Sequence, residues 1–283
     1  MLRERISEGI YVFTSDLYAQ VTAGVIVSSE GAVVVDTLPF PQETRQLLAF
    51  IRQRGLQVPY VINTHSHADH TNGSYLFEEA TLIAHQGCRE ILRQHGQKVL
   101  EEAKAETPEV AEVRLRLPSV TFDQGATLRL GDRTMQLIPL PGHTPDSIGV
   151  YVEEDKILFA GDAVMPVPYI VGGDRMALMD SLRLIRKLGL ENIVQGHGEV
   201  ILRGEVEEVL ETSIHYLETI YEKVKEAIET RASPEAVAEI DIEQCGKSRI
   251  PLNGLVQQLH EANLLYLYDL MMDQVGKEPR MII

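Results

Sequence analysis

His65-Ser66-His67-Ala68-Asp69-His70 gathers three imidazoles and a carboxylate within six residues. The segment follows the apolar run Val58–Ile62, which is typical of a buried strand, and precedes a helix-like stretch. Alternate residues of an extended segment point to the same side, so His65 and His67 can converge on one ion. The aspartate and the last histidine lie past the turn and can serve a second ion beside it. A loop with so many polar groups is costly to fold unless a cation fixes it.

Three more polar residues stand at the ends of strand-like segments, within Pro141-Gly142-His143, Gly161-Asp162 and Gly196-His197-Gly198. The adjoining glycines let the backbone turn sharply and let each side chain project into a shared cleft. Together with the first loop, these motifs predict one metal centre. Its seven candidate ligands are His65, His67, Asp69, His70, His143, Asp162 and His197.

The order and context of these motifs, over roughly residues 10–200, resemble the metallo-β-lactamase superfamily of metallohydrolases, in its hydroxyacylglutathione hydrolase and lactonase-like branch. The resemblance implies an α+β fold in the form of a four-layer αβ/βα sandwich; strand counting alone would leave other α+β arrangements open. It also implies how the ligands divide. The first ion would take His65, His67 and His143, the second would take Asp69, His70 and His197, and Asp162 would bridge the two.

A histidine-rich set with carboxylates suits two divalent ions, for which Zn²⁺ is our expectation and Fe and Mn are the alternatives. A water between two such ions would be deprotonated near neutral pH and would act as a bridging hydroxide nucleophile. Asp69 is the candidate catalytic residue, because it could orient this nucleophile or carry its proton to the leaving group. Asp36 either accepts a hydrogen bond from a ligating imidazole or only ends a strand.

The stretch 163–176 is too rich in proline and glycine for a helix or a central strand, which predicts a loop at the rim of the metal cleft. Tyr169 is a candidate donor to a substrate carbonyl, and Arg175 is a candidate partner for a carboxylate or phosphate. The alternative is a loop held only by apolar packing of Val164, Met165 and Ile170.

The pattern along the chain predicts short strands over residues 10–14, 21–28, 32–36 and 58–63, and an amphipathic helix over 42–54. From about Gly204 onward the character becomes helical, with apolar stripes over 205–231 and 252–272. We therefore expect a catalytic domain over residues 1–203 and a helical C-terminal extension over 204–283 that packs on it. The extension could wall the cleft, form a homodimer contact or serve packing alone.

The formal net charge of −16 argues against a nucleic-acid partner, because it repels phosphates and no basic patch interrupts it. No apolar run reaches the roughly 20 residues that span a bilayer, and the first residues carry no apolar segment typical of a secretory signal. Two cysteines, Cys88 and Cys245, make no disulfide framework. We expect a cytoplasmic protein that acts on a small molecule and not at a membrane.

Among reactions of this ligand set, we favour metal-dependent hydrolysis of a small ester, thioester or lactone. Secreted β-lactamases usually lack the aspartate that matches Asp69, and flavin-linked di-iron oxidoreductases usually carry Glu where His67 stands. The alternatives are a phosphoesterase, a sulfur dioxygenase with mononuclear iron, or a metal-bearing module without catalysis.

Overall fold

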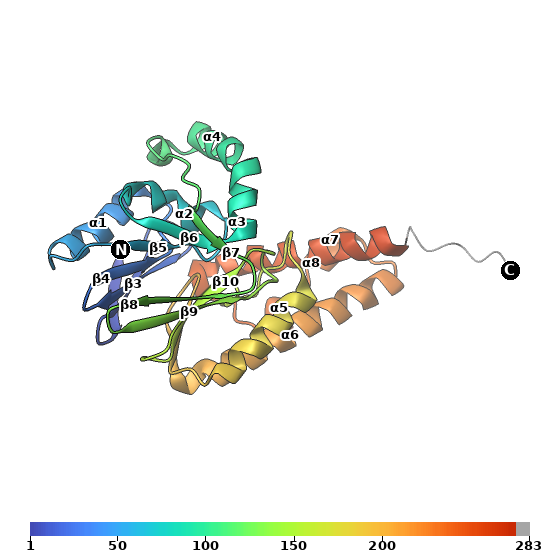
Figure 1. Ribbon diagram of the computed structural model, residues 1–283. Coiled ribbons are helices and arrows are strands. Elements are labelled where there is room, and N and C mark those ends of the chain that lie inside the picture. The colour runs from blue at the N-terminus through green and yellow to red at the C-terminus, as the bar shows by residue number, and fades with distance from the viewer. Residues whose placement is uncertain (276–283) are drawn as a thin grey trace.

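Two mixed β-sheets form the centre of the computed structural model, which describes residues 1–275 (Figure 1). The seven-stranded sheet has the order β1-β2-β3-β4-β5-β6-β7, and the six-stranded sheet has the order β13-β12-β11-β10-β9-β8. The strands of the first sheet are β1 (Leu2–Ser7), β2 (Ile10–Thr14), β3 (Thr22–Ser28), β4 (Gly31–Val35), β5 (Tyr60–Ile62), β6 (Thr81–His85) and β7 (Val120–Phe122). Those of the second are β8 (Ala126–Leu130), β9 (Arg133–Pro139), β10 (Ile148–Val152), β11 (Ile157–Gly161), β12 (Asn192–Gln195) and β13 (Ile201–Leu202).

Helices cover the outer face of each sheet, and a further part of the core lies between the sheets (Figure 1). On the first sheet lie α1 (Pro41–Arg52), α2 (Ala68–Thr71), α3 (Gln86–Ile91), a π-helical turn (Leu92–Gly96) and α4 (Gln97–Glu106). On the second sheet lie α5 (Arg175–Ile185) and α6 (Arg203–Glu229), α8 (Leu255–Val275) packs on α6, and α7 (Pro234–Ala238) packs on α8. Short 3₁₀ turns connect them at Asn72–Leu76, Pro108–Val110, Arg186–Leu188, Ile242–Cys245 and Pro251–Gly254. The predicted four-layer αβ/βα sandwich is confirmed.

The inner layer is built from the alternating apolar residues of both sheets, including Ile26 and Val35 from the first and Val150 and Phe159 from the second. Phe159 packs directly on the backbone of Gly24, where a Cβ atom would collide with its ring. The absence of a side chain at this position therefore lets the two sheets approach closely.

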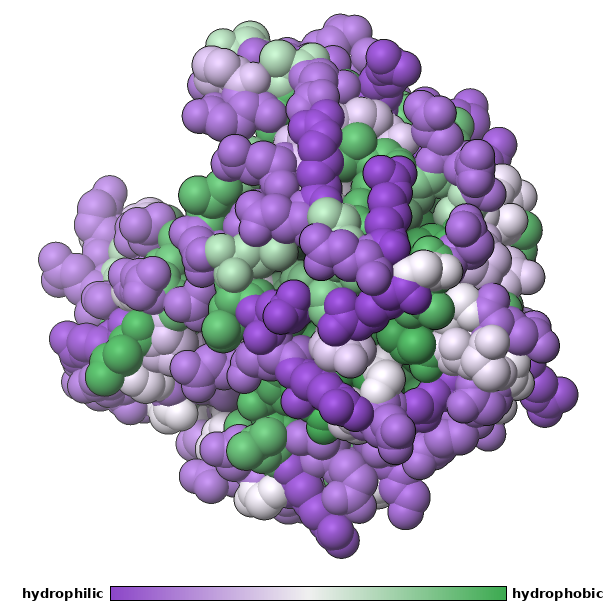
Figure 2. All heavy atoms as spheres, turned by 90° about the vertical axis from the view of Figure 1, so that its left-hand side faces the viewer, coloured by the Kyte–Doolittle hydropathy of each residue, from purple (hydrophilic) through white to green (hydrophobic). Residues whose placement is uncertain are grey.

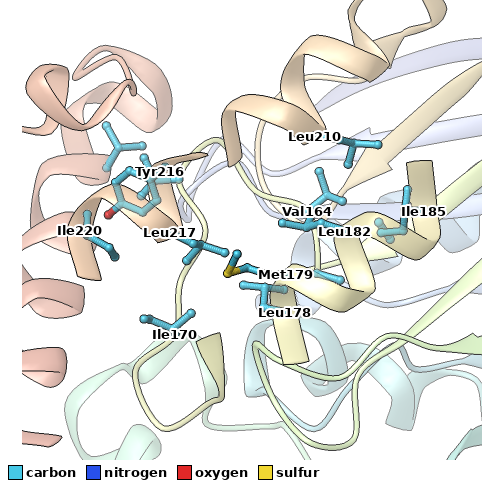
Figure 3. Close-up of a cluster of buried hydrophobic side chains, with 14 of the residues drawn as sticks. Val164, Ile170, Leu178, Met179, Leu182, Ile185, Leu210, Tyr216, Leu217 and Ile220 are labelled. Atoms are coloured by element: carbon cyan, nitrogen blue, oxygen red, sulfur yellow. The ribbon is translucent and has the colours of Figure 1, made fainter. Parts of the chain in front are cut away.

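The helical extension shares its core with the second sheet. Figure 3 shows Leu178 and Met179 of α5 close to Leu217 of α6, with Ile170 of the preceding loop beside them. The predicted boundary between residues 203 and 204 falls in the first turn of α6, and residues 276–283 of the predicted extension lie outside the described residues. The division into two domains and the homodimer contact stay predictions.

Two further elements were not predicted from the sequence pattern. β1 pairs with β2 at the edge of the first sheet, although none of its residues is buried, so its sequence lacks the apolar signal of a buried strand. The helical stretch 86–106 is interrupted by the π turn, where Leu115 packs so close to Gly96 that a Cβ atom there would lie 2.9 Å from Leu115 Cδ1.

One face of the molecule is mostly hydrophilic. On the face at the left of Figure 1, hydrophilic side chains cover most of the surface and apolar ones show between them in small groups (Figure 2). None of the helices within residues 1–275 is both long and apolar enough to cross a bilayer.

Candidate metal centre

Strand ends from both sheets deliver all seven predicted ligands to one place. The loop after β5 carries the first four, and β5 is parallel to its neighbours β4 and β6 in the middle of the first sheet. The second sheet supplies the others from the segments after β9, β11 and β12. Because β11 and β12 are parallel, the side chains of Asp162 and His197 emerge at the same sheet edge.

The donor atoms form two groups, each within 4.8 Å, and the carboxylate of Asp162 lies against both. The first group is His65, His67, His143 and Asp162; the second is Asp69, His70 and His197. Asp162 Oδ2 lies 3.3 Å from His143 Nε2 and 3.6 Å from His197 Nε2. Asp162 Oδ1 lies 3.1 Å from His70 Nε2. Oδ2 thus lies between imidazoles of both groups, and Oδ1 faces His70 of the second group, so the carboxylate is close enough to both groups to serve as a bridging ligand.

These residues fit a metal site on physical grounds. His65 Nε2, His70 Nε2 and Asp162 Oδ1 are buried and make no hydrogen bond of acceptable geometry, although buried polar atoms normally have a partner. Burial disfavours the charged form of Asp162, but the imidazoles of His70 and His197 outweigh it and hold the pKa of the carboxyl well below its usual value. Burial lowers the pKa of His65, which keeps this imidazole neutral and able to donate a lone pair. A divalent cation would satisfy the unpaired atoms.

Comparison of the sequence with known protein families agrees with a metal site. A family model of the metallo-beta-lactamase superfamily matches residues 18–197, which is more than half of the chain. The chain belongs to the metallo-β-lactamase superfamily.

Several members of the superfamily are similar to this chain. A beta-lactamase-like protein 2 homolog from Caenorhabditis elegans is 30% identical over 120 residues, covering 42% of this chain and 39% of that protein. Acyl-coenzyme A thioesterase MBLAC2 from Gallus gallus is 28% identical over 178 residues, covering 54% and 64%. Hydroxyacylglutathione hydrolase from Methylococcus capsulatus is 27% identical over 158 residues, covering 54% and 53%. The chain thus spans about half the length of these relatives.

A solved structure supports the fold over nearly the whole chain. A metallo-beta-lactamase family protein from Thermus thermophilus superposes with a TM-score of 0.68 at 18% identity, covering 96% of this chain and 95% of that one. A metallo-beta-lactamase from Pontibacter korlensis covers 74% of this chain, with a TM-score of 0.60 and 21% identity. The similarity to the Thermus protein therefore extends over more of this chain than the similarity to the Pontibacter lactamase.

Asp36 orients the imidazole of His70 at the candidate metal centre of this superfamily member. Its carboxylate lies 3.0 Å from His70 Nδ1 and accepts hydrogen bonds from the amide and the hydroxyl of Thr64 at 2.7 and 2.6 Å. A proton on His70 Nδ1 leaves Nε2 free to face Asp162. Of the two interpretations left open for Asp36, the structure shows the hydrogen bond to a candidate ligand. Asp36 also has a φ of +57°, a left-handed conformation that Asp tolerates better than most residues.

Main-chain carbonyls orient two other imidazoles in the same way. His143 Nδ1 donates to the carbonyl oxygen of Tyr169 at 2.9 Å, and His197 Nδ1 donates to that of Ala19 at 2.9 Å. Because a carbonyl oxygen can only accept, the proton of each ring must sit on Nδ1. The Nε2 lone pair of each ring is then available at the centre.

The two predicted substrate residues occupy different surroundings. The Tyr169 ring lies 5.9 Å from the ring of His143, and burial raises the pKa of its hydroxyl. The guanidinium of Arg175 instead lies 4.2 Å from the centre of the Tyr221 ring on α6, and its Nη1 is 3.3 Å from Met179 Sδ. The structure thus brings Tyr169 next to the centre and turns Arg175 toward the helical extension. Their roles in binding substrate stay predictions.

The loop between β2 and β3, which carries the half-exposed Tyr18, was not predicted to lie at the centre. Burial raises the pKa of the Tyr18 hydroxyl, and the nearby carboxylates of Asp69 and Asp162 raise it further. The loop is held against the centre because its Ala19 carbonyl accepts from His197. Leu17-Tyr18-Ala19-Gln20 contains no glycine or proline, although Ala19 and Gln20 adopt a positive φ. No local pattern therefore pointed to this loop.

Proposed function

We propose that the protein is a dinuclear-metal hydrolase that cleaves a small ester, thioester or lactone. The observation that carries the proposal is the carboxylate of Asp162, which lies against imidazoles of both groups of potential ligands. The names of two relatives, an acyl-coenzyme A thioesterase and a hydroxyacylglutathione hydrolase, favour an acyl substrate over a phosphate ester.

The chain's own residues have separable tasks in this reaction. Two divalent cations, for which Zn²⁺ fits the donor set best, would supply an activated water and polarise the acyl oxygen. His65, His67 and His143 would hold one cation, and Asp69, His70 and His197 the other. The Nδ1 contacts of His70, His143 and His197 fix the rings in the tautomer that a ligand needs.

Asp69 is the proposed proton carrier. Its Oδ2 lies 3.3 Å from His197 Nε2 and 3.8 Å from His70 Nε2. Burial opposes ionisation of this carboxyl, but the two imidazoles outweigh it and lower its pKa to about 2. Asp69 is therefore ionised at neutral pH, and we assign it the task of orienting the attacking water or carrying its proton to the leaving group.

Metal analysis and turnover test the proposal together. Purified protein loaded with Zn²⁺, Fe²⁺ or Mn²⁺ would be assayed on a thioester, a lactone, a carboxylic ester and a phosphodiester. We expect two bound ions and turnover of an acyl substrate, and a His67→Ala variant should lose metal and activity together. His215→Ala is the matched control, because this exposed histidine lies on α6 outside both ligand groups.

Each alternative has its own outcome. A single iron with consumption of oxygen would indicate the sulfur dioxygenase, and turnover of the phosphodiester alone would indicate a phosphoesterase. Full metal content and full activity in His67→Ala would overturn the ligand assignment. Metal binding without turnover of any substrate would favour the non-catalytic module.

A further inference from the structure

A cavity of about 410 Å³ opens beside the metal centre. One wall is the metal loop itself, with Ser66, His67 and Ala68, and a second wall includes Thr144 and Pro145, which follow the ligand His143. The opposite wall is apolar. It is formed by Ile91, Leu92, Val99, Leu100, Val113 and Leu115.

The apolar wall belongs to the segment between β6 and β7, which stands above the first sheet at the top of Figure 1. This segment has small hydrophobic clusters of its own, one around Cys88 and Leu92 and one around Leu100 and Val113, separate from the three larger cores. It also contains the π turn at Leu92–Gly96, an irregularity that occurs frequently at functional sites. The segment therefore forms a separate cover on one side of the centre.

Several polar groups in the lining already have partners within the protein, although the exposed side chains of His95 and Arg114 also line the cavity. Arg116 Nη1 donates to the carbonyls of Ser74 and Phe77 at 3.0 and 2.5 Å. Thr71 Oγ1 donates to the carbonyl of His67 at 3.0 Å, and Thr144 Oγ1 lies 2.7 Å from the hydroxyl of Ser147. Because these groups have partners, a ligand gains more from apolar contact here than from new hydrogen bonds.

The apolar side chain of Val99 in this wall is exposed to solvent. Val99 is 47% exposed although it lines the cavity. Covering such a surface with an apolar ligand group removes it from water, which stabilises the complex. The cavity volume lies at the lower end of the range of roughly 300–1,000 Å³ usual for small-molecule sites, which suits a single unbranched chain.

We propose that this cavity receives the apolar acyl chain of the substrate, so that the preferred substrates are thioesters or esters of medium-length aliphatic acids. The inference rests on the proposed function, because it takes the acyl carbonyl to lie at the centre beside His67. The acyl part is favoured over the leaving group, since the thiols that carry acyl groups in cells are polar and charged and do not match an apolar wall.

A substrate series measures the effect of chain length. The acyl group would be varied from acetyl through butyryl and hexanoyl to octanoyl on one fixed thiol, N-acetylcysteamine, and kcat/KM determined for each. Each added methylene should raise kcat/KM about fourfold, which is the fold-change that corresponds to about 0.8 kcal/mol, until the cavity is full. A flat series, or one in which only the size of the thiol matters when the acyl group is fixed, would overturn the inference while leaving the hydrolase in place.

Variants locate the effect in the cavity. Val99→Phe and, as a second filling variant, Ala103→Leu should lower the ratio of octanoyl to acetyl kcat/KM about tenfold. Val120→Phe is the matched control, because Val120 is 48% exposed on β7 and outside the cavity lining, so that its ratio should stay that of the wild type. An equal change in the filling variants and the control would argue against the cavity.

Binding provides a readout that does not depend on turnover. The probe is the S-octyl thioether of N-acetylcysteamine, which cannot be hydrolysed, titrated calorimetrically into metal-loaded protein. It should bind at least about tenfold more tightly than the S-ethyl thioether, and Val99→Phe should remove this preference. Tight octyl binding without any turnover would refute the proposed reaction and keep the acyl-chain site, whereas equal binding of both thioethers would refute the site.

Discussion

Asn263 on α8 holds the main chain of Ile170 in the loop behind the metal centre. Its Oδ1 accepts from the Ile170 amide at 2.9 Å, and its Nδ2 donates to the carbonyl of Pro168 at 2.7 Å. Between these two residues stands Tyr169, whose carbonyl accepts from His143 Nδ1. A buried side chain of the helical extension is therefore linked to a candidate metal ligand through one peptide segment.

Replacing Asn263 by Leu should destabilise the fold and weaken metal binding. The change leaves the buried polar groups of Pro168 and Ile170 without partners, at a cost of about 1–3 kcal/mol each in unfolding free energy. The measurements are thermal unfolding of the metal-free protein and the dissociation constant for Zn²⁺. Tyr266→Phe is the control, because it removes a 3.2 Å hydrogen bond to Gly173 in the same loop without touching the segment around Tyr169. Equal Zn²⁺ affinity in wild type and Asn263→Leu would disprove the link to His143.

Asp36→Asn should lower metal affinity at the group that contains His70. The amide keeps the size of the carboxylate and tolerates the left-handed backbone, but it cannot supply the charge that fixes the His70 tautomer. We expect a loss of about tenfold to a hundredfold in affinity, measured by competition with a chelator. Thr37→Val is the control, because Thr37 donates to the main-chain carbonyl of His70 at 3.0 Å but does not contact its ring. A loss of the same size in both variants would indicate a general effect on the loop.

Gly196→Ala should abolish binding of at least one ion. The new Cβ atom would collide with Oδ1 of Asp162, the carboxylate that faces both ligand groups. Metal content after dialysis, determined by plasma emission, gives a direct answer. Gly204→Ala is the control, since a Cβ atom at Gly204 meets nothing within 4 Å. Retention of the full metal content in Gly196→Ala would show that Asp162 is not needed in its present position.

Metal removal should make stability sensitive to alkaline pH. In the metal-free protein, burial opposes protonation of His197, but Asp162 and Asp69 outweigh it and raise its pKa to about 10 from the ordinary 6.5. This proton stabilises the folded state fully below pH 6.5, and its contribution is lost as the pH rises toward about 10. Over this range Tm of the metal-free protein should fall, whereas Tm of the Zn²⁺-loaded protein should fall less, because the cation replaces the proton.

The same linkage predicts proton release on metal binding. Calorimetric titration with Zn²⁺ should give a heat that depends on the ionisation enthalpy of the buffer. Identical pH profiles of Tm for the two forms, together with a heat independent of buffer, would contradict the assignment of His197 to the site.

Local sequence was sufficient to recognise the ligand motifs, whereas the four layers were predicted from the resemblance to the superfamily. Metal chemistry demands histidines and carboxylates, and a strand end followed by glycine places them at a sheet edge, so the loop from His65 to His70 and the later motifs could be recognised one by one. The apolar stripes of α6 and α8 likewise predicted helices, because their period of about 3.6 residues is a property of neighbouring positions. The Asp36 contact was open between two interpretations until its distance to His70 was known.

The residues that contact these motifs could not be predicted from the neighbouring sequence. The Ala19 carbonyl contacts His197, which is 178 residues away, and Asn263 contacts Ile170, which is 93 residues away. Such contacts produce no recognisable pattern of residue spacing in the sequence, because they arise only when packing brings two distant segments together. Arg175 shows the same limit, since only the fold shows that its guanidinium lies against the aromatic ring of Tyr221. The sequence by itself thus determined which side chains can bind metal, because these residues stand in short motifs. The orientation of each imidazole ring and the shape of the neighbouring cavity were decided by the tertiary structure, because they depend on packing between distant segments.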